Sequence, residues 1–231
     1  MENQTANQGV HQIPNLGFSN AYLVEATPDS LILIDTGTSS AGPKIVSYLE
    51  KIGKKPGNIS HIILTHADAD HSGSAAMLKR LSSAKLAIHE LDAPRISGEN
   101  KKIKETNGLS GAILTLVGSL MKVERVKPDL LLKDRDSVGP LTIVHTPGHT
   151  DGSICIYKPC HALFVGDTLR TDGSGELKLP SSFMSRNMDE LRTSVEKISK
   201  LEFSMLLPGH GKPIAEDASH KVREFVANSH R

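Results

Sequence analysis

The stretch LTHADADHSG places two histidines and two aspartates within six positions, directly after an apolar run. Histidine nitrogens and carboxylate oxygens are the ligands that zinc, manganese and iron take from proteins. In an extended segment, His66 and Asp68 project to the same side. Asp70 and His71 follow, where we expect a helix that begins near Ser72. One short loop can therefore present ligands to two metal ions from different directions.

Four further glycine-bearing loops follow strand-like segments, with the sequences LIDTG, VHTPGHTDG, FVGDT and LLPGHG. They supply Asp35, His149, Asp167 and His210. In sheets covered by helices, ligands gather where strands end, because loops there are free to vary without disturbing the core. Two ions that share an oxygen bridge need roughly six or seven protein ligands. The loops therefore predict one shared metal site.

The elements that must position these loops alternate between strand-like and helix-like patterns, with no composition break that marks a linker. We expect strands at 20–26, 30–35, 59–65, 85–89, 141–146, 153–157, 162–167 and 204–211. We expect helices at 43–53, 74–83 and 187–201, the last with Asn187 and Glu190 spaced as a capping box. Gly148 and Gly209 allow a close backbone approach beside the lone histidines.

Together these motifs resemble those of the metallo-β-lactamase superfamily of hydrolases. Its first acidic motif matches Asp35, and its His-x-His-x-Asp-His motif matches HADADH with Asp68 in place of a histidine. Its later motifs match His149, Asp167 and His210, in the family's order. The resemblance implies an α/β fold, a four-layer αβ/βα sandwich of two mixed β-sheets with helices outside, and a metal site at one edge.

The resemblance also divides the predicted ligands between two cations, with Asp167 between them. The first set is His66, Asp68 and His149. The second set is Asp70, His71 and His210. Asp35 is expected to orient a ligand or the loop rather than to bind metal. Asp70 is the candidate catalytic residue, since it can accept or relay a proton while it binds metal.

Asp68 makes the identity of the metal an open question. Three aspartates and one hydroxide cancel the charge of two divalent cations, whereas a histidine at position 68 leaves one positive charge. Zinc is the metal that the family implies, and manganese or iron is favoured by the harder oxygen ligand. If Asp68 is too short to reach, one metal remains. In simpler alternatives, Asp70 caps a helix, Asp35 is a turn residue, and the lone histidines lie on surface loops.

The predicted activity is hydrolysis of a small ester, lactone or thioester, because cations at such a site ionise a water molecule and polarise a carbonyl oxygen. Three alternatives stay open. They are a phosphodiesterase of the same fold, an iron-dependent oxidoreductase, and a non-catalytic metal-binding sensor. The expected partner is a small-molecule substrate, and a homodimer is possible.

The composition limits the possible domain organisation, partners and location of the protein. A chain of 231 residues with 38% hydrophobic residues is expected to form a single domain over 1–231. The net charge of +1 comes from well-mixed side chains and predicts no nucleic-acid partner. Without an export signal or an apolar run of about 18 residues, we expect a cytoplasmic protein with no membrane partner. We expect Cys155 and Cys160 to be reduced.

Two segments are expected to depart from the compact domain. Residues 1–17 are predicted to be extended or poorly ordered. Residues 91–128 are predicted to form a helical insertion, in which 109–123 is apolar around much of a helical surface. That helix either packs on the core or in a dimer interface, or acts as a lid over the metals.

Overall fold

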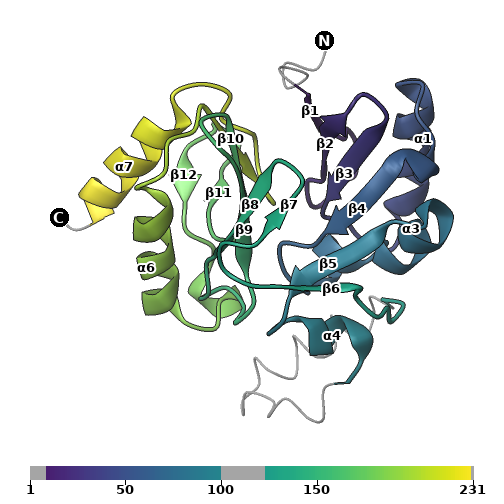
Figure 1. Ribbon diagram of the computed structural model, residues 1–231. Helices are drawn as coiled ribbons and strands as arrows, with labels where there is room; N and C mark the ends of the chain where they lie inside the picture. Colours follow the sequence, from purple (N-terminus) through teal and green to yellow (C-terminus); the bar gives the residue numbers. More distant parts are fainter. Residues whose placement is uncertain (1–8, 100–122, 230–231) are drawn as a thin grey trace.

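The computed structural model describes residues 9–99 and 123–229, which form two facing β-sheets with helices on the outer sides (Figure 1). The first sheet runs in the order β1 (Val10–Gln12), β2 (Tyr22–Thr27), β3 (Ser30–Ile34), β4 (Ile59–Ile63), β5 (Lys85–His89) and β6 (Leu130–Leu132). The second runs in the order β13 (Met205–Pro208), β10 (Ala162–Gly166), β9 (Ile154–Lys158), β8 (Leu141–His145) and β7 (Ser137–Val138).

Both sheets are mixed. In the first sheet, β1, β2 and β3 pair antiparallel, whereas β3 to β6 pair parallel. In the second, β13 runs parallel to β10 and the remaining pairs are antiparallel. A short ribbon of β11 (Arg170–Thr171) and β12 (Leu177–Lys178) stands apart from both.

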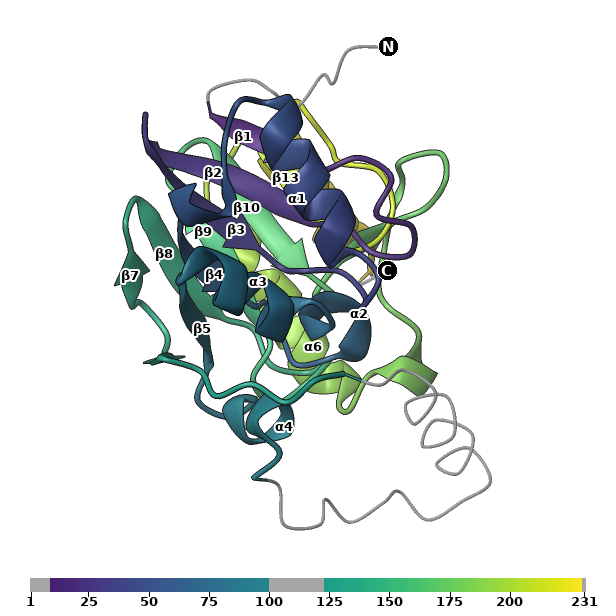
Figure 2. The same cartoon turned by 90° about the vertical axis from the view of Figure 1, so that its right-hand side faces the viewer.

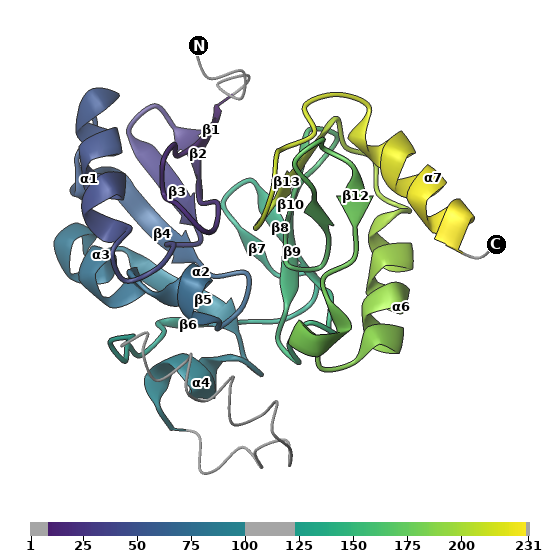
Figure 3. The ribbon, with the colours of Figure 1, turned by 180° about the vertical axis from the view of Figure 1, so that it is seen from behind.

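The helices cover the outer face of each sheet. Figure 2 shows α1 (Gly42–Lys51) and α3 (Ala75–Ser82) lying over the first sheet. Figure 3 shows α6 (Met188–Ile198) and α7 (Ala218–Ser229) on the outer side of the second sheet. Two short helices, α2 (Ala69–Ser72) and α4 (Ala93–Ser97), and two 3-10 turns, η1 (Pro56–Asn58) and η2 (Ser182–Met184), lie in the connections. None of the helices within 9–99 and 123–229 has the length and hydropathy of a membrane span.

Three apolar layers hold this arrangement together. In β3, Leu31 and Leu33 pack toward the helices of the first sheet, whereas Ile32 and Ile34 pack into the layer between the sheets. A third layer joins the second sheet to α6 and α7. Strands buried on both faces read as continuous apolar runs, as SLILI does. The predicted αβ/βα sandwich is therefore confirmed.

The local boundaries differ from the prediction at α2. This helix begins at Ala69, three residues before the predicted start near Ser72. Asp68 is its N-cap residue with an extended backbone, and its carbonyl accepts the backbone N–H groups of His71 and Ser72 at 2.9 Å. Asp70 thus lies inside the helix, and the alternative that it caps a later helix is wrong.

The two segments that were expected to depart from the domain are described only in part. Val10–Gln12 of the N-terminal segment forms β1. Within 91–128, residues 93–97 form α4, and the chain from 123 leads into β6. The apolar helix predicted at 109–123 lies, except for its last residue, outside the described residues.

Candidate metal centre

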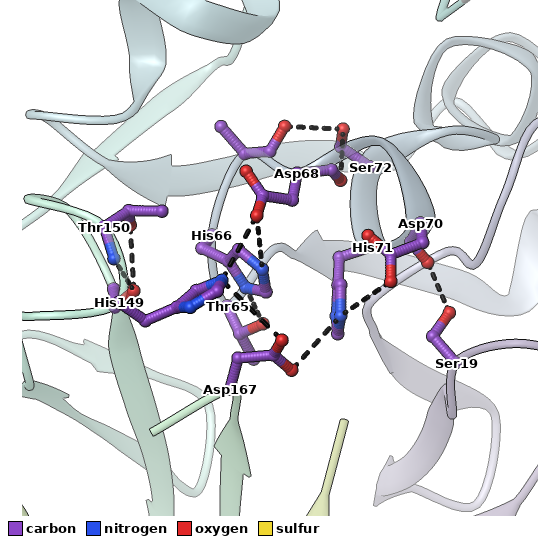
Figure 4. A network of polar contacts seen from close by, with 12 residues as sticks. Ser19, Thr65, His66, Asp68, Asp70, His71, Ser72, His149, Thr150 and Asp167 are labelled. Carbon is purple, nitrogen blue, oxygen red and sulfur yellow. Dashed lines mark hydrogen bonds and ion pairs between the residues drawn. The ribbon is translucent and has the colours of Figure 1, made fainter. Parts of the chain in front are cut away.

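The candidate centre lies at one edge of the sandwich, where loops from both sheets meet (Figure 4). His66 and Asp68 follow β4, and the next residues turn into α2. His149 lies in the loop after β8, Asp167 directly follows β10, and His210 follows β13. The structure thus brings together residues that are up to 144 positions apart, and the loops follow strands as the sequence predicts.

The first predicted ligand set forms a compact group. Nε2 of His149 lies 3.1 Å from Oδ2 of Asp68, and Nε2 of His66 lies 3.7 Å from the same oxygen. In Figure 4 the three side chains turn their polar ends toward one another. His66 and His149 are buried, whereas the Asp68 side chain is 30% exposed.

The second predicted set is equally close. Nε2 of His210 lies 3.2 Å from Oδ2 of Asp70 and 3.3 Å from Nε2 of His71. Nε2 of His71 lies 3.6 Å from the Asp70 carboxylate. Two of its side chains are partly exposed, His210 at 12% and Asp70 at 17%.

Asp167 lies between the two sets. Its Oδ2 is 3.6 Å from Nε2 of His149 and 3.4 Å from Nε2 of His210, and its Oδ1 is 3.3 Å from Nε2 of His71. His66, His71 and Asp167 also form a third group whose donor atoms lie within 4.8 Å of one another. One carboxylate therefore contacts histidines of both sets, the geometry that a bridging ligand needs.

Contacts to the far ring nitrogens fix the orientations of His210, His71 and His66. Nδ1 of His210 lies 3.0 Å from the carbonyl of Phe18, and Nδ1 of His71 lies 2.8 Å from Asp35. Carbonyl and carboxylate oxygens only accept hydrogen bonds, so both Nδ1 atoms donate and both Nε2 atoms face the centre. Nδ1 of His66 pairs with the Thr65 hydroxyl at 3.0 Å.

Asp35 contacts residues that neighbour or form the centre without facing its other candidate ligands. Its Oδ1 accepts the backbone N–H of Thr65, and its Oδ2 accepts the Thr65 hydroxyl and His71 Nδ1, each at 2.8 Å. The residue is buried and has a left-handed φ of 58° at the end of β3. It joins β3, β4 and α2 and faces the side of His71 away from the other candidate ligands.

The electrostatics of the centre keep its carboxylates ionised. Burial by itself raises the pKa of Asp167, but the charge of His71 and the hydrogen bond from His210 hold it well below the usual value. Burial alone lowers the pKa of His210, yet hydrogen bonds to Asp167 and Asp70 raise it to about 9. Burial, and then the charge of His71, lowers the pKa of His66 to about 4.

A cation fits this set of atoms. Nε2 of His66 and Oδ1 of Asp167 are both buried and have no hydrogen-bond partner. A buried polar atom without a partner costs about 1–3 kcal/mol, so such atoms call for a ligand. Both are metal-ligating atoms, and both face the other candidate ligands. The donor chemistry and the unpaired atoms therefore suit one or more divalent cations.

Two residues at and in α4 were missed by the sequence analysis, namely its N-cap residue Asp92 and Arg95. Asp92 is buried, and its carboxylate accepts the backbone N–H of Ala67, the Thr150 hydroxyl and the backbone N–H of Gly152 at 2.8, 2.9 and 3.1 Å. It thereby ties the His66 loop to the His149 loop. Arg95 donates from Nη2 to Oδ1 of Asp68 at 2.7 Å. The one available signal was an aspartate three residues after the strand at 85–89, in the loop that follows it.

The cysteines lie outside the centre. Cys155 is buried in β9, Cys160 is exposed, and both are free, as the sequence predicts. Burial raises the pKa of the Cys155 thiol to about 11. Neither cysteine therefore belongs to the ligand set.

Two facing mixed sheets with a histidine and aspartate cluster at their shared edge define a metallo-hydrolase architecture. The sequence profile of the Metallo-beta-lactamase superfamily matches residues 14–210. The chain belongs to this superfamily.

Three similar proteins illustrate the relationship. The probable metallo-hydrolase MJ0888 of Methanocaldococcus jannaschii is 29% identical over 198 residues, which cover 84% of this chain and 88% of that protein. Human acyl-coenzyme A thioesterase MBLAC2 is 31% identical over 160 residues, which cover 64% of this chain but only 54% of that protein. The crystal structure of TTHA1623 in a di-iron-bound form is 25% identical with a TM-score of 0.65, covering 85% of this chain and 89% of that one.

Proposed function

We propose that this protein is a hydrolase with a dinuclear metal centre that cleaves a small ester, lactone or thioester. One observation carries the proposal. The donor atoms of seven side chains converge in two sets around Asp167, and two of the buried atoms lack any protein partner. The predicted ligand sets coincide with two of the three groups that the geometry brings together.

Each side chain has a role under this proposal. His66, Asp68 and His149 hold one cation, and Asp70, His71 and His210 hold the other. Asp167 keeps the two together. When bound, such cations supply an ionised water molecule as nucleophile and polarise the oxygen of the scissile group. Asp70 accepts the released proton, because its carboxylate lies among the candidate ligands and its side chain is 17% exposed.

An apolar side chain beside the centre favours a substrate with an apolar portion. The Phe18 ring packs edge-on against His210 with ring centroids 5.4 Å apart, and Phe18 remains 69% exposed. An exposed aromatic ring next to a polar centre is suited to contact an acyl chain. The similarity to an acyl-coenzyme A thioesterase supports a thioester among the three candidate bonds.

Zinc is the proposed metal, and manganese and iron are the competing ones. The carboxylate of Asp68 and the similarity to a protein crystallised with two irons both favour iron. Metal analysis after anaerobic and aerobic purification separates these metals. Iron with redox turnover would replace the hydrolase proposal by an oxidoreductase, and zinc or manganese with hydrolysis would support it.

The proposal is tested by metal quantification combined with a panel of an ester, a lactone, a thioester and a phosphodiester. We expect about two metal ions per chain and turnover of at least one of the first three. The Asp167→Asn variant should bind less metal and lose more than about 100-fold in rate on the same substrate. Turnover of the phosphodiester alone would redirect the proposal, and bound metal without any turnover would favour a sensor.

A further inference from the structure

A guanidinium group lies next to one of the candidate metal ligands. Arg95, on the short helix α4, donates from Nη2 to Oδ1 of Asp68 at 2.7 Å. Both side chains are about one-third exposed, at 33% and 30%. An arginine usually repels a bound cation, so its place beside a candidate ligand needs an explanation.

The two carboxylate oxygens of Asp68 have different partners. Oδ1 is taken by Arg95, whereas Oδ2 lies 3.1 Å from Nε2 of His149 and 3.7 Å from Nε2 of His66. A partly exposed carboxylate without this contact is free to rotate about its terminal bond. With Arg95 in place, a single oxygen faces the position between the two histidines.

Arg95 also contacts a second carboxylate, that of Asp92. Its Nη1 lies 3.9 Å from Oδ2 of Asp92, the residue at the N-cap position of α4. Asp92 is buried and fixed by the backbone of Ala67 and Gly152 and by the Thr150 hydroxyl. The guanidinium therefore bridges a rigid buried carboxylate and a more exposed one.

The pair also changes the charge of the centre. Asp68, Asp70 and Asp167 bring three negative charges, and an ionised water brings a fourth, which together cancel two divalent cations. A guanidinium is always charged and forms a directional bond to a carboxylate. Arg95 thus places one positive charge beside Asp68, the residue that adds one negative charge relative to a histidine at this position.

We infer that Arg95 is a positioning residue of the metal centre, which presents one oxygen of Asp68 to the cation and offsets the charge of that carboxylate. This inference rests on the proposed metal centre. It adds to that centre a residue that contacts a metal ligand without binding the metal itself. Arg95 acts on the centre through Asp68 alone. Its contribution to metal affinity should therefore disappear when position 68 carries no carboxylate.

A double-mutant cycle tests this dependence by measuring zinc affinity in competition with a chelator. Arg95→Gln should weaken binding of the zinc ion held by His66, Asp68 and His149 by about 10- to 100-fold, the range found for outer partners of metal ligands. In an Asp68→His background, the same Arg95→Gln change should alter affinity by less than about twofold, since imidazole is neutral and offers no second oxygen. Arg95→Lys keeps the charge and should lose less affinity than Arg95→Gln.

The control is Arg80→Gln, which breaks an exposed ion pair with Glu124 on the α3 side of the first sheet. It should leave zinc affinity unchanged. Thermal unfolding of the metal-free variants shows whether Arg95→Gln still folds. An equal loss in both backgrounds, or no loss with Asp68 present, would overturn the inference while leaving the metal centre intact. A wild-type chain that binds no zinc would instead overturn the proposed function.

Discussion

Oδ2 of Asp35 lies 2.8 Å from Nδ1 of His71, and the same oxygen accepts the Thr65 hydroxyl at 2.8 Å. This buried carboxylate thereby sets which nitrogen of His71 donates and which faces the candidate cations. The link joins the end of β3 to helix α2, so the orientation of a candidate ligand depends on how the first sheet is assembled.

Asp35→Asn tests that link. An amide has only one acceptor oxygen, so it cannot serve Thr65 and His71 as the carboxylate does. We expect a 10- to 100-fold loss of metal affinity or of hydrolytic rate, on the order of other changes to outer partners of metal ligands. Asp29→Asn, at an exposed turn between β2 and β3, is the matched control and should change neither. An unaltered metal affinity in Asp35→Asn would show that His71 does not need this carboxylate.

Gly209 allows the strand-end loop to approach the centre, as the sequence suggests for the glycine beside His210. A Cβ atom at this position would lie 2.6 Å from Oδ1 of Asp167 and 2.6 Å from Cε1 of His71. Gly209→Ala should therefore displace two candidate ligands and lower metal occupancy and rate by at least about 10-fold. Gly173→Ala places its Cβ in open space and serves as the control. Full metal occupancy in Gly209→Ala would contradict the close approach.

The sequence located the candidate ligands because each follows an apolar strand and is flanked by glycine, serine or threonine. HADADH, His149, Asp167 and His210 all carry this local pattern. The contacts of Asp92 and Arg95 could not be predicted in the same way. Arg95 lies in α4, a helix of only five residues, and Asp92 is its N-cap residue. Both fall in the segment 91–128, which the sequence presents as an insertion.

The larger fold was predictable where strands are long and apolar. Strands of five or six residues such as β3, β8 and β10 were expected close to their observed positions. Strands of two or three residues, such as β1, β6 and β11, are too short to show a periodic pattern, and their pairing depends on neighbours distant in the sequence. The helix α7 was also missed, because only Ala218, Ser219 and Val222 of its twelve residues are buried.

Asp92 is expected to matter for stability independently of metal. It accepts hydrogen bonds on both oxygens, from Gly152 on Oδ1 and from Ala67 and Thr150 on Oδ2. In Asp92→Asn, an NH2 group must face one of these donors, which should lower the free energy of unfolding by about 1–3 kcal/mol. Urea unfolding with a chelator present measures the effect, and the exposed Asp189→Asn is the control. Equal unfolding free energies for Asp92→Asn and wild type would rule out this bracing role.

The two thiols should differ sharply in reactivity with pH. Burial raises the pKa of Cys155 to about 11, so at pH 8 this group stays a neutral thiol, and the thiolate forms only as the pH rises through that value. Cys160 is exposed. A disulfide reagent at pH 8 should therefore label Cys160 quickly and Cys155 only after denaturation. Rapid labelling of both thiols in the native protein, checked with Cys160→Ser, would contradict the buried placement of β9.

The central claim is that the seven side chains bind two divalent cations on either side of Asp167. Anomalous diffraction from a crystal equilibrated with zinc tests it most directly. The account predicts two peaks, one between His66, Asp68 and His149 and the other between Asp70, His71 and His210, each within coordination distance of Asp167, roughly 2 Å. A crystal equilibrated with excess zinc that shows no anomalous peak among these residues would contradict the account.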